Sequence, residues 1–380
     1  MFAKLFREMA LNDQTTGIQT RPNCTIDAAY KSVRYNKIDF PVKLMALLSD
    51  EENSVICPYG IATVLSMAAE GACEESLNDI LHTLGYKNKT DLRESVLREQ
   101  NYNSQAFKSE NSLKVIKGSD EIEVLEDYNN IVNEFYSTII KEDVGNKSSV
   151  ELENISTFKA EWLNKLRRDT SYSNCFRNED GTIAKPSFLI SKKLYLKYAG
   201  LSLDGTKSNY AKCVALPYKD KSYEMILVNT TKTLSLQNII DIFRSMESRE
   251  CIIKFPEFRV ESDFDLIPMM QRLGLKNIFE EYFPAFDHIA TQKLYVESFK
   301  QKAKIDVDKN GTTAQAVTTI GFGFFSCMPL ELVFDRPFSY FLRNTSTGEI
   351  LFMGKVNKLD DCERKSDDKY LLQMIDDLLE

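Results

Sequence analysis

The first half of the chain contains apolar residues spaced with the period of an α-helix. Residues 58–85 read PYGIATVLSMAAEGACEESLNDILHTLG. A first helix is expected to begin at Pro58, which suits an initial helical turn, and to end near Gly71. Its apolar face would be formed by Ile61, Val64, Leu65 and Ala68. A second helix should follow and end at Gly85. Its apolar stripe would be Leu77, Ile80, Leu81 and Leu84.

The second half is rich in short runs of β-branched and aromatic residues, which favour strands. Such runs are YEMILVN from Tyr223, CIIKFPEFRV from Cys251, KAKIDVD from Lys302, LELVF from Leu330, FSYFLRN from Phe338 and EILFMGKV from Glu349. A helical pattern lies between some of them, at 265–275. Helices mostly first and strands mostly later predict an α+β chain built around large β-sheets.

Composition and charge narrow the class of protein. With 43% hydrophobic and 27% charged residues, the chain is expected to be soluble and globular. Its net charge of −8 and the lack of a sustained basic stripe argue against a nucleic-acid partner. We expect no membrane partner either.

The amino terminus and the cysteines predict the compartment. Lys4, Arg7 and Glu8 interrupt the first nine residues, which leaves no apolar core of signal-peptide length. The eight cysteines form no CxxC pair, so reduced thiols are expected rather than a disulfide framework. Both features favour a cytoplasmic protein over a secreted one.

Catalytic chemistry is not suggested by any motif. Of the two histidines, His82 falls in the second predicted helix and His288 in a predicted loop without a nearby serine or cysteine. Nucleophilic catalysis needs a base beside its nucleophile. There is also no phosphate-binding glycine loop and no metal-spaced histidine or cysteine cluster. We therefore expect no enzyme, no catalytic residues, no cofactor and no metal site.

Residues 311–330, GTTAQAVTTIGFGFFSCMPL, form a twenty-residue stretch without a charged side chain. Threonine, valine and glycine disfavour a helix, and glycines and Pro329 make it unsuitable as a membrane span. In an extended chain side chains alternate between two faces. Small residues alone then occupy one face: Thr312, Ala314, Ala316 and Thr318. The other face carries Thr313, Gln315, Val317 and Thr319.

Residues 304–338, KIDVDKNGTTAQAVTTIGFGFFSCMPLELVFDRPF, resemble the reactive-centre region of the serpins, the serine-protease-inhibitor superfamily. Five further motifs occur in the family's order: NSVICPYGIATVLSMAAEGACEESLNDILHTLG, NISTFKAEW, VALPYK, FPEFRVESDFDLIPMMQRLGL and GEILFMGKV. The second of these ends at Trp162, the only tryptophan. The resemblance implies the serpin fold: large mixed β-sheets packed with helices and an exposed reactive-centre loop.

Three segments, LPYKDKSYEMILV, KIDVDKNGT and ILFMGKV, are most similar to the intracellular serpins carried by poxviruses. This finer resemblance implies a role in virus–host interaction and residence in the host cytoplasm.

The family resemblance implies suicide inhibition of a serine protease. The protease cleaves the loop, and the loop then inserts as a new strand in the main sheet and carries the acyl-enzyme with it. An inserted strand cannot carry charges on its inward face. The small face formed by Thr312, Ala314, Ala316 and Thr318 meets this requirement, with Gly311 as the hinge.

The family's usual loop length places the scissile bond about fourteen residues after Gly311, between Phe325 and Ser326. The bonds Phe324–Phe325 and Phe322–Gly323 are close alternatives. No lysine, arginine or aspartate lies in the loop, so trypsin-like proteases, caspases and granzyme B are not implied. An aromatic residue before the bond fits a chymotrypsin-like protease, including the cathepsin G type.

The resemblance also implies a region where the sheet opens. Its positions here are Cys57, Gly60, Asn154, Trp162 and Gln301. The family usually has serines in place of Cys57 and Gly60 and histidine in place of Gln301, whereas Asn154 matches. Lys309 likewise stands where the family usually has an acidic residue.

A deletion near 144–150 is the largest departure from the family. At most six residues separate the predicted strands YSTIIKEDV and VELENISTF. The family places a helix across the front of the sheet there. Parallel neighbouring strands need a crossover of roughly a dozen residues, so a rearranged sheet edge or a displaced strand is expected. Two alternatives to inhibition follow: a non-inhibitory serpin-fold binding protein, or a substrate cleaved without trapping.

The resemblance divides the chain into three parts: an amino-terminal extension or helix at 1–34, a serpin domain at 35–358 and a carboxy-terminal amphipathic tail at 359–380. The apolar stripe of the tail would be Leu371, Leu372, Ile375, Leu378 and Leu379. It predicts either a helix packed on the body or a partner-binding tail. We expect a monomer.

Overall fold

The computed structural model describes residues 38–48, 52–100, 106–118, 123–136, 141–145, 147–169, 171, 174–202, 210–229, 235–311 and 329–361. All of them belong to the compact unit Asn36–Glu380. The predictions for residues 1–34, for the loop positions Thr312 to Ser326 and for most of the tail lie outside the described residues.

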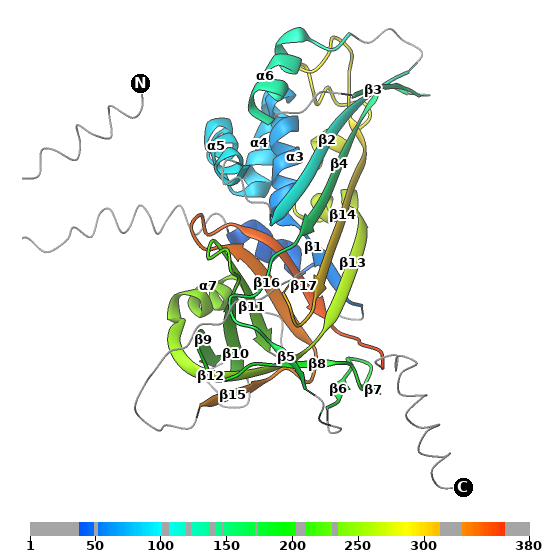
Figure 1. Cartoon of the computed structure of the whole chain (residues 1–380). Helices are drawn as coiled ribbons and strands as arrows, with labels where there is room; N and C mark the ends of the chain where they lie inside the picture. Colours follow the sequence, from blue (N-terminus) through cyan, green and yellow to red (C-terminus); the bar gives the residue numbers. More distant parts are fainter. Residues whose placement is uncertain are drawn as a thin grey trace, which may run out of the picture. The chain divides into compact units, whose positions relative to one another are not determined.

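A five-stranded main sheet has the strand order β13-β14-β4-β2-β3 (Figure 1). Its strands are β13 (Phe258–Asp265), β14 (Val296–Val307), β4 (Ser149–Phe158), β2 (Phe107–Lys117) and β3 (Lys141–Val144). The two central strands, β14 and β4, are parallel, whereas β14 is antiparallel to β13 and β4 is antiparallel to β2. We call the boundary between β14 and β4 the seam.

Helices pack against one face of the main sheet, and the two predicted at 58–85 are both present. These are α3 (Pro58–Gly71) and α4 (Glu74–Leu84), and Gly85 ends α4 with a left-handed φ of 78°. All fourteen residues of α3 are buried, beyond the single apolar face that its spacing predicts. Its many small residues allow this, because the sheet and neighbouring helices can approach it from every side. Two of those neighbours are α5 (Lys89–Gln100) and α6 (Glu126–Tyr136).

A second sheet of ten strands follows the order β1-β17-β16-β11-β10-β9-β12-β8-β5, with β15 paired to β12. Its strands are β1 (Ser54–Ile56), β17 (Ile350–Val356), β16 (Phe338–Asn344), β11 (Tyr223–Asn229), β10 (Tyr210–Pro217), β9 (Leu194–Ser202), β12 (Glu247–Pro256), β8 (Phe188–Ile190), β5 (Arg167–Asp169) and β15 (Leu330–Val333). The runs predicted as strands are strands, which confirms the α+β class. The run from Cys251 divides at Glu257 between β12 and β13, which belong to different sheets.

Shorter elements complete the unit. They are a helix at 38–45, α7 (Leu236–Ser245), α8 (Ile267–Arg272), the 3₁₀ turn η1 (Asn277–Phe279) and the hairpin of β6 (Phe176–Arg177) and β7 (Ile183–Ala184). The helix α8 confirms the helical pattern at 265–275. Within the described ranges, no helix has the length and apolar character needed to cross a membrane.

The connection from β3 to β4 corrects one expectation. Four residues separate Val144 from Ser149, and β3 and β4 are not parallel neighbours. The strand β2 lies between them, parallel to β3 and antiparallel to β4, so β3 and β4 run in opposite directions. The expectation was wrong because strands consecutive in sequence were assumed to be adjacent in the sheet.

A direct connection around the end of β2 is long enough. Four extended residues reach roughly 13 Å, whereas crossing one strand requires about two spacings of ~4.8 Å. Two hydrogen bonds anchor the connection to that end: Gly145 N donates to Lys117 O at 2.8 Å, and Gly118 N donates to Ser148 Oγ at 3.3 Å. The main sheet is therefore continuous at this edge despite the deletion.

Candidate functional site

Gln301 of β14 forms hydrogen bonds across the seam. Its fully buried side-chain amide donates to Asn154 Oδ1 on β4 at 2.7 Å. The same amide donates to Cys57 O at 2.9 Å and accepts from Cys57 N at 2.8 Å. One side chain thus connects both seam strands to the amino-terminal end of α3.

Asn154 extends this network to β2. Its Nδ2 donates to Asn111 Oδ1 at 2.7 Å and to Ser109 Oγ at 2.9 Å, and its Oδ1 also accepts from Ser156 Oγ at 2.9 Å. Buried polar groups are costly unless they are paired, and these amides are paired. The resulting polar cluster spans three strands and the start of α3 without a titratable histidine.

The departures from the family at Cys57 and Gly60 fit this cluster. A Cβ on Gly60 would lie 2.3 Å from Asn154 Oδ1, so glycine makes room for the asparagine amide. Cys57 is the residue before the first turn of α3, and its Sγ accepts from Gly60 N at 3.3 Å. Burial raises the pKa of the Cys57 thiol to about 12, so it stays a neutral thiol.

Gly311 lies where the loop leaves β14, held between the ends of the two seam strands. It forms one antiparallel bridge with Asp308, just after β14, and another with Glu161, just after β4. Its φ is +131°, and an added Cβ would lie 2.4 Å from Ala160 O. Glycine is therefore required here both by backbone conformation and by close approach.

Trp162 holds the turn that precedes Gly311. Its ring stacks on Tyr218 at 4.5 Å between ring centroids, and its Nε1 donates to Asp308 O at 3.0 Å. Its backbone N donates to Asn310 O at 3.1 Å. Within the turn, Asp308 Oδ1 accepts from Asn310 N at 2.8 Å. These contacts hold the turn 308–311 against the end of β4.

The predicted sheet-opening residues therefore form two groups. Cys57, Gly60, Asn154 and Gln301 meet in the polar cluster. Trp162 instead belongs with the hinge glycine at the end of the seam.

The outward face of the main sheet is polar. Ion pairs cross it from strand to strand: Lys304–Glu261 at 3.1 Å, Lys302–Asp263 at 3.7 Å and Lys114–Glu151 at 3.3 Å. At the seam, Ile155 is the large apolar side chain exposed on this face. Charged side chains of both signs are suited to contact with water. Apart from Ile155, the described side chains on this face at the seam can therefore be solvated without a covering helix.

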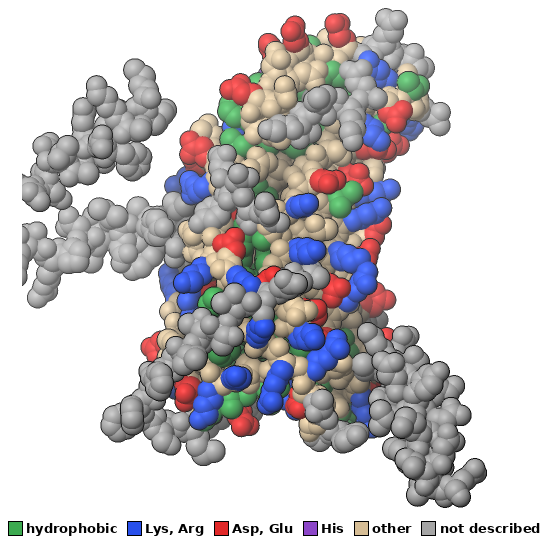
Figure 2. Space-filling view, in the orientation of Figure 1, with side chains coloured by type: hydrophobic (Ala, Val, Ile, Leu, Met, Phe, Trp, Pro, Cys, Tyr) green, Lys and Arg blue, Asp and Glu red, His purple; other side chains and the backbone are tan. Residues whose placement is uncertain are grey.

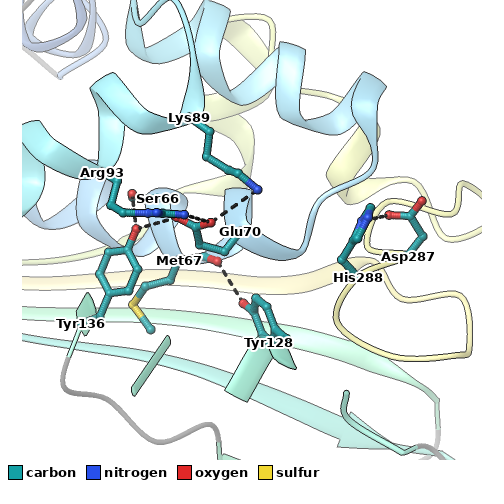
Figure 3. Close-up of polar contacts among 9 residues, drawn as sticks. All are labelled: Ser66, Met67, Glu70, Lys89, Arg93, Tyr128, Tyr136, Asp287 and His288. Atoms are coloured by element: carbon teal, nitrogen blue, oxygen red, sulfur yellow. Dashed lines mark hydrogen bonds and ion pairs between the residues drawn. The ribbon is translucent and has the colours of Figure 1, made fainter. Parts of the chain in front are cut away.

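Behind the sheet, an ionic cluster joins three helices (Figure 3). The Glu70 carboxylate of α3 is fully buried and accepts from Arg93 Nε at 2.7 Å and Nη2 at 2.6 Å. Lys89 lies 3.4 Å from the same carboxylate, and Tyr136 of α6 donates to it at 3.4 Å. The sequence interpretation missed this cluster, although a glutamate in the apolar run MAAEG was a signal for it.

No catalytic arrangement is seen within the described ranges. His288 contacts Asp287 at 2.6 Å, and both side chains are exposed. His82 is exposed on α4. Neither imidazole has a serine or cysteine hydrogen-bonded to it there, and the same residues contain no group of three metal-ligating side chains.

Comparison with known proteins links this geometry to a family. The family model described as "Serpin (serine protease inhibitor)" matches residues 36–156 and 137–359. Iripin-1 of Ixodes ricinus is 25% identical over 81% of this chain and 90% of its own length. Heparin cofactor 2 of Rattus norvegicus is 24% identical over 83% of this chain and 75% of its own length.

Solved structures match over most of the chain. Native protease nexin-1 with heparin has a TM-score of 0.70 at 20% identity and covers 86% of this chain and 99% of its own. Serpin48 of Tenebrio molitor has a TM-score of 0.69 at 19% identity and covers 89% of this chain and all of its own. At these identities the likeness shows a shared fold.

Replacing Gly60 by alanine tests the packing of the polar cluster. Gly60→Ala should destabilise the protein by about 1–3 kcal/mol, because the methyl group collides with the Asn154 amide. In an Asn154→Ala background the same change should stabilise by roughly 0.5–1 kcal/mol, the usual advantage of alanine over glycine in a helix. Chemical unfolding of the four proteins gives both values. If Gly60→Ala lowered the free energy of unfolding equally in both backgrounds, the contact between residue 60 and the Asn154 amide would be unimportant.

Proposed function

The chain belongs to the serpin family, and from that premise we propose that it inhibits a chymotrypsin-like serine protease by suicide trapping. The serpin fold expected from the sequence is confirmed by the solved relatives. We further propose that the protease cleaves the bond Phe325–Ser326 and that the cut loop then inserts into the main sheet. The target proteases include those of the cathepsin G type. The poxvirus-type subclass and residence in the host cytoplasm stay predictions from the sequence.

The observation that carries the proposal is the double pairing of Gly311. An inserted loop must run antiparallel to both β14 and β4, and Gly311 already does so through its bridges to Asp308 and Glu161. The hinge thus has the backbone arrangement of the first residue of a new strand. Insertion can extend this pairing without first forming a turn.

The same pairing predicts a register for the inserted strand. Continued along β14, it sets Thr312 opposite Val307, Ala314 opposite Ile305, Ala316 opposite Ala303 and Thr318 opposite Gln301. Continued along β4, it sets Ala316 opposite Ser156 and Thr318 opposite Asn154. The two continuations agree, because Ala303 already pairs with Ser156 and Gln301 with Asn154.

This register supports the assignment of the small face. The positions on β14 opposite Thr312, Ala314, Ala316 and Thr318 are all buried. Small side chains therefore enter where space under the sheet is limited. Gln315, Val317 and Thr319 would lie on the outward face beside Lys304, Lys302 and Lys300, in contact with water.

Backbone hydrogen bonding favours insertion once the loop is cut. Opening the seam breaks one parallel ladder of backbone hydrogen bonds, and insertion forms two antiparallel ladders. Each net bond contributes roughly 0.5–1.5 kcal/mol. The uncut loop cannot insert fully because both of its ends are anchored, at Gly311 and at β15.

The sequence left two alternatives to inhibition open. The protein could be a non-inhibitory binding protein, or a substrate that the protease cleaves without being trapped. Both depended on a sheet disturbed by the deletion near 144–150. Since the connection passes directly around the end of β2 and the sheet is continuous, that argument loses its basis. The polar outward face further supports insertion, because no described element has to be moved from the seam.

The scissile bond is tested by incubation with a chymotrypsin-like protease such as cathepsin G. We expect an SDS-stable complex and release of a fragment that begins at Ser326, read by mass spectrometry. Phe325→Asp should abolish the complex because a carboxylate does not fit the hydrophobic primary pocket, and Phe324→Ala should reduce the rate much less. Cleavage without complex would identify a substrate. No reaction would identify a binding protein, and a different fragment would overturn the bond assignment.

The register is tested by placing one arginine on each face of the loop. Thr312→Arg puts a charge on the inward face, so complex formation should give way to simple cleavage. Thr313→Arg, its matched control, puts the same charge on the outward face and should leave complex formation near the unmodified level. The ratio of complex to cleaved inhibitor on a denaturing gel measures both. If Thr313→Arg lost complex formation and Thr312→Arg kept it, the face that carries Thr313 would be the inward one.

A further inference from the structure

Four basic side chains gather where β5 and β8 meet, and we call them the β5–β8 basic cluster: Lys165, Arg167, Lys192 and Lys193. Arg167 pairs with Ile190, so Lys165 and Lys192, each two residues beyond this pair, lie at the same end of the β5–β8 strand pair. Leu166, between Lys165 and Arg167, is buried, so these two side chains point away from the core. All four cluster residues are exposed.

The cluster carries uncompensated positive charge. Over the described residues, no ion pair joins any of its four members to a carboxylate, whereas nearby acids already have partners. Glu257 pairs with Arg168 at 3.0 Å, and Asp169 pairs with Lys254 at 2.7 Å. Glu250 of β12 lies opposite Tyr195, and the exposed Glu331 of β15 lies opposite Ile252 of β12. In Figure 2, lysine and arginine side chains are spread over the middle and lower parts of the face, and the lower part includes the region of β5 and β8 in Figure 1. This local charge contrasts with the net charge of −8 of the whole chain.

The cluster lies close to both ends of the reactive loop. On the downstream side, Cys251 of β12 pairs with Leu330 on one edge and with Leu194 on the other. Leu330 and Leu194 are therefore about two strand spacings, roughly 10 Å, apart, and Lys193 directly precedes Leu194. On the upstream side, Lys165 follows three residues after Trp162, which holds the hinge. This proximity to both ends of the loop brings the cluster within reach of a protease that is bound to the loop.

We propose that the β5–β8 basic cluster is an auxiliary docking surface for an acidic face of the target protease. This inference rests on the proposed function, and it adds a charge requirement to the preference set by Phe325. Complementary charges next to a binding site raise the association rate by steering the encounter, and this effect weakens as salt is added.

Tyr195 indicates that the surface suits a protein partner. It is 70% exposed on β9, two residues after Lys193. Tyrosine and arginine are enriched at protein interfaces, where they often act as anchors. A linear polyanion would be bound by the charges alone and would not need this side chain.

The test uses one protease in two charge forms. Chymotrypsin is used unmodified and after succinylation of its zymogen, which converts surface ammonium groups into carboxylates before activation. The unmodified inhibitor should react faster with the succinylated form, and the difference should shrink at high ionic strength. Lys192→Glu/Lys193→Glu should lower the association rate constant for the succinylated form about tenfold at low salt. The fraction of inhibitor that ends in complex should not change.

A matched control separates local from global charge. Lys87→Glu/Lys276→Glu makes the same change in net charge at two exposed positions near α4 and η1, far from β5 and β8 in Figure 1. It should leave the rate almost unchanged. Equal losses in both double variants, or no loss in either, would overturn the proposal. Retention on a heparin column that depends on the cluster, without any effect on the protease rates, would also overturn it in favour of a sulfated polysaccharide.

Failure of the docking surface can be distinguished from failure of trapping. Absence of an SDS-stable complex between the unmodified inhibitor and either protease form contradicts the proposed function alone. Reversible binding to succinylated chymotrypsin whose catalytic serine is replaced by alanine then still tests the surface. Weaker binding by Lys192→Glu/Lys193→Glu than by the control supports the proposal, and equal binding contradicts it. Tyr195→Ala should weaken binding to both charge forms, since its contribution is not electrostatic.

Discussion

Gln301 and Asn154 hydrogen-bond across the seam between β14 and β4, and insertion of a strand there would have to separate them. The amides are buried, so breaking their bond without replacing it is costly. Gly60 leaves room for the Asn154 amide, and Cys57 binds Gln301 from the start of α3. In the proposed mechanism, Thr318 would enter between these two amides. Its hydroxyl could replace part of the bonding that is lost.

The hinge and the shortened connection act at opposite ends of this seam. Gly311 is already paired with the residues that follow each seam strand, so in the proposed mechanism the direction and register of the new strand would be set before cleavage. At the other end, β3 continues to β4 around the end of β2. The outward face between them bears charged residues that water can solvate. The short connection near 144–150 is thus compatible with a continuous sheet, which the proposed insertion requires.

The sequence predicted where helices and strands form better than it predicted which strands lie side by side in a sheet. The helices at 58–85 and the late strands follow from hydrophobic spacing and turn residues, and the structure has them. Periodicity does not reveal strand order, so β3 and β4 were wrongly assumed to be adjacent. It also could not show that the run from Cys251 divides between two sheets at Glu257. Gln301 hydrogen-bonds Cys57 and Asn154, which lie in two other segments of the chain that are distant in sequence. No local sequence pattern predicts such contacts.

Whether the cut loop enters the seam can be measured by the thermal unfolding midpoint. The protein is cleaved between Gly321 and Met328 by a protease that does not remain bound, and intact and cleaved forms are heated under the same conditions. Insertion would add a strand to the main sheet, so the account predicts a higher midpoint for the cleaved form. An unchanged or lower midpoint after complete cleavage at that site would contradict it.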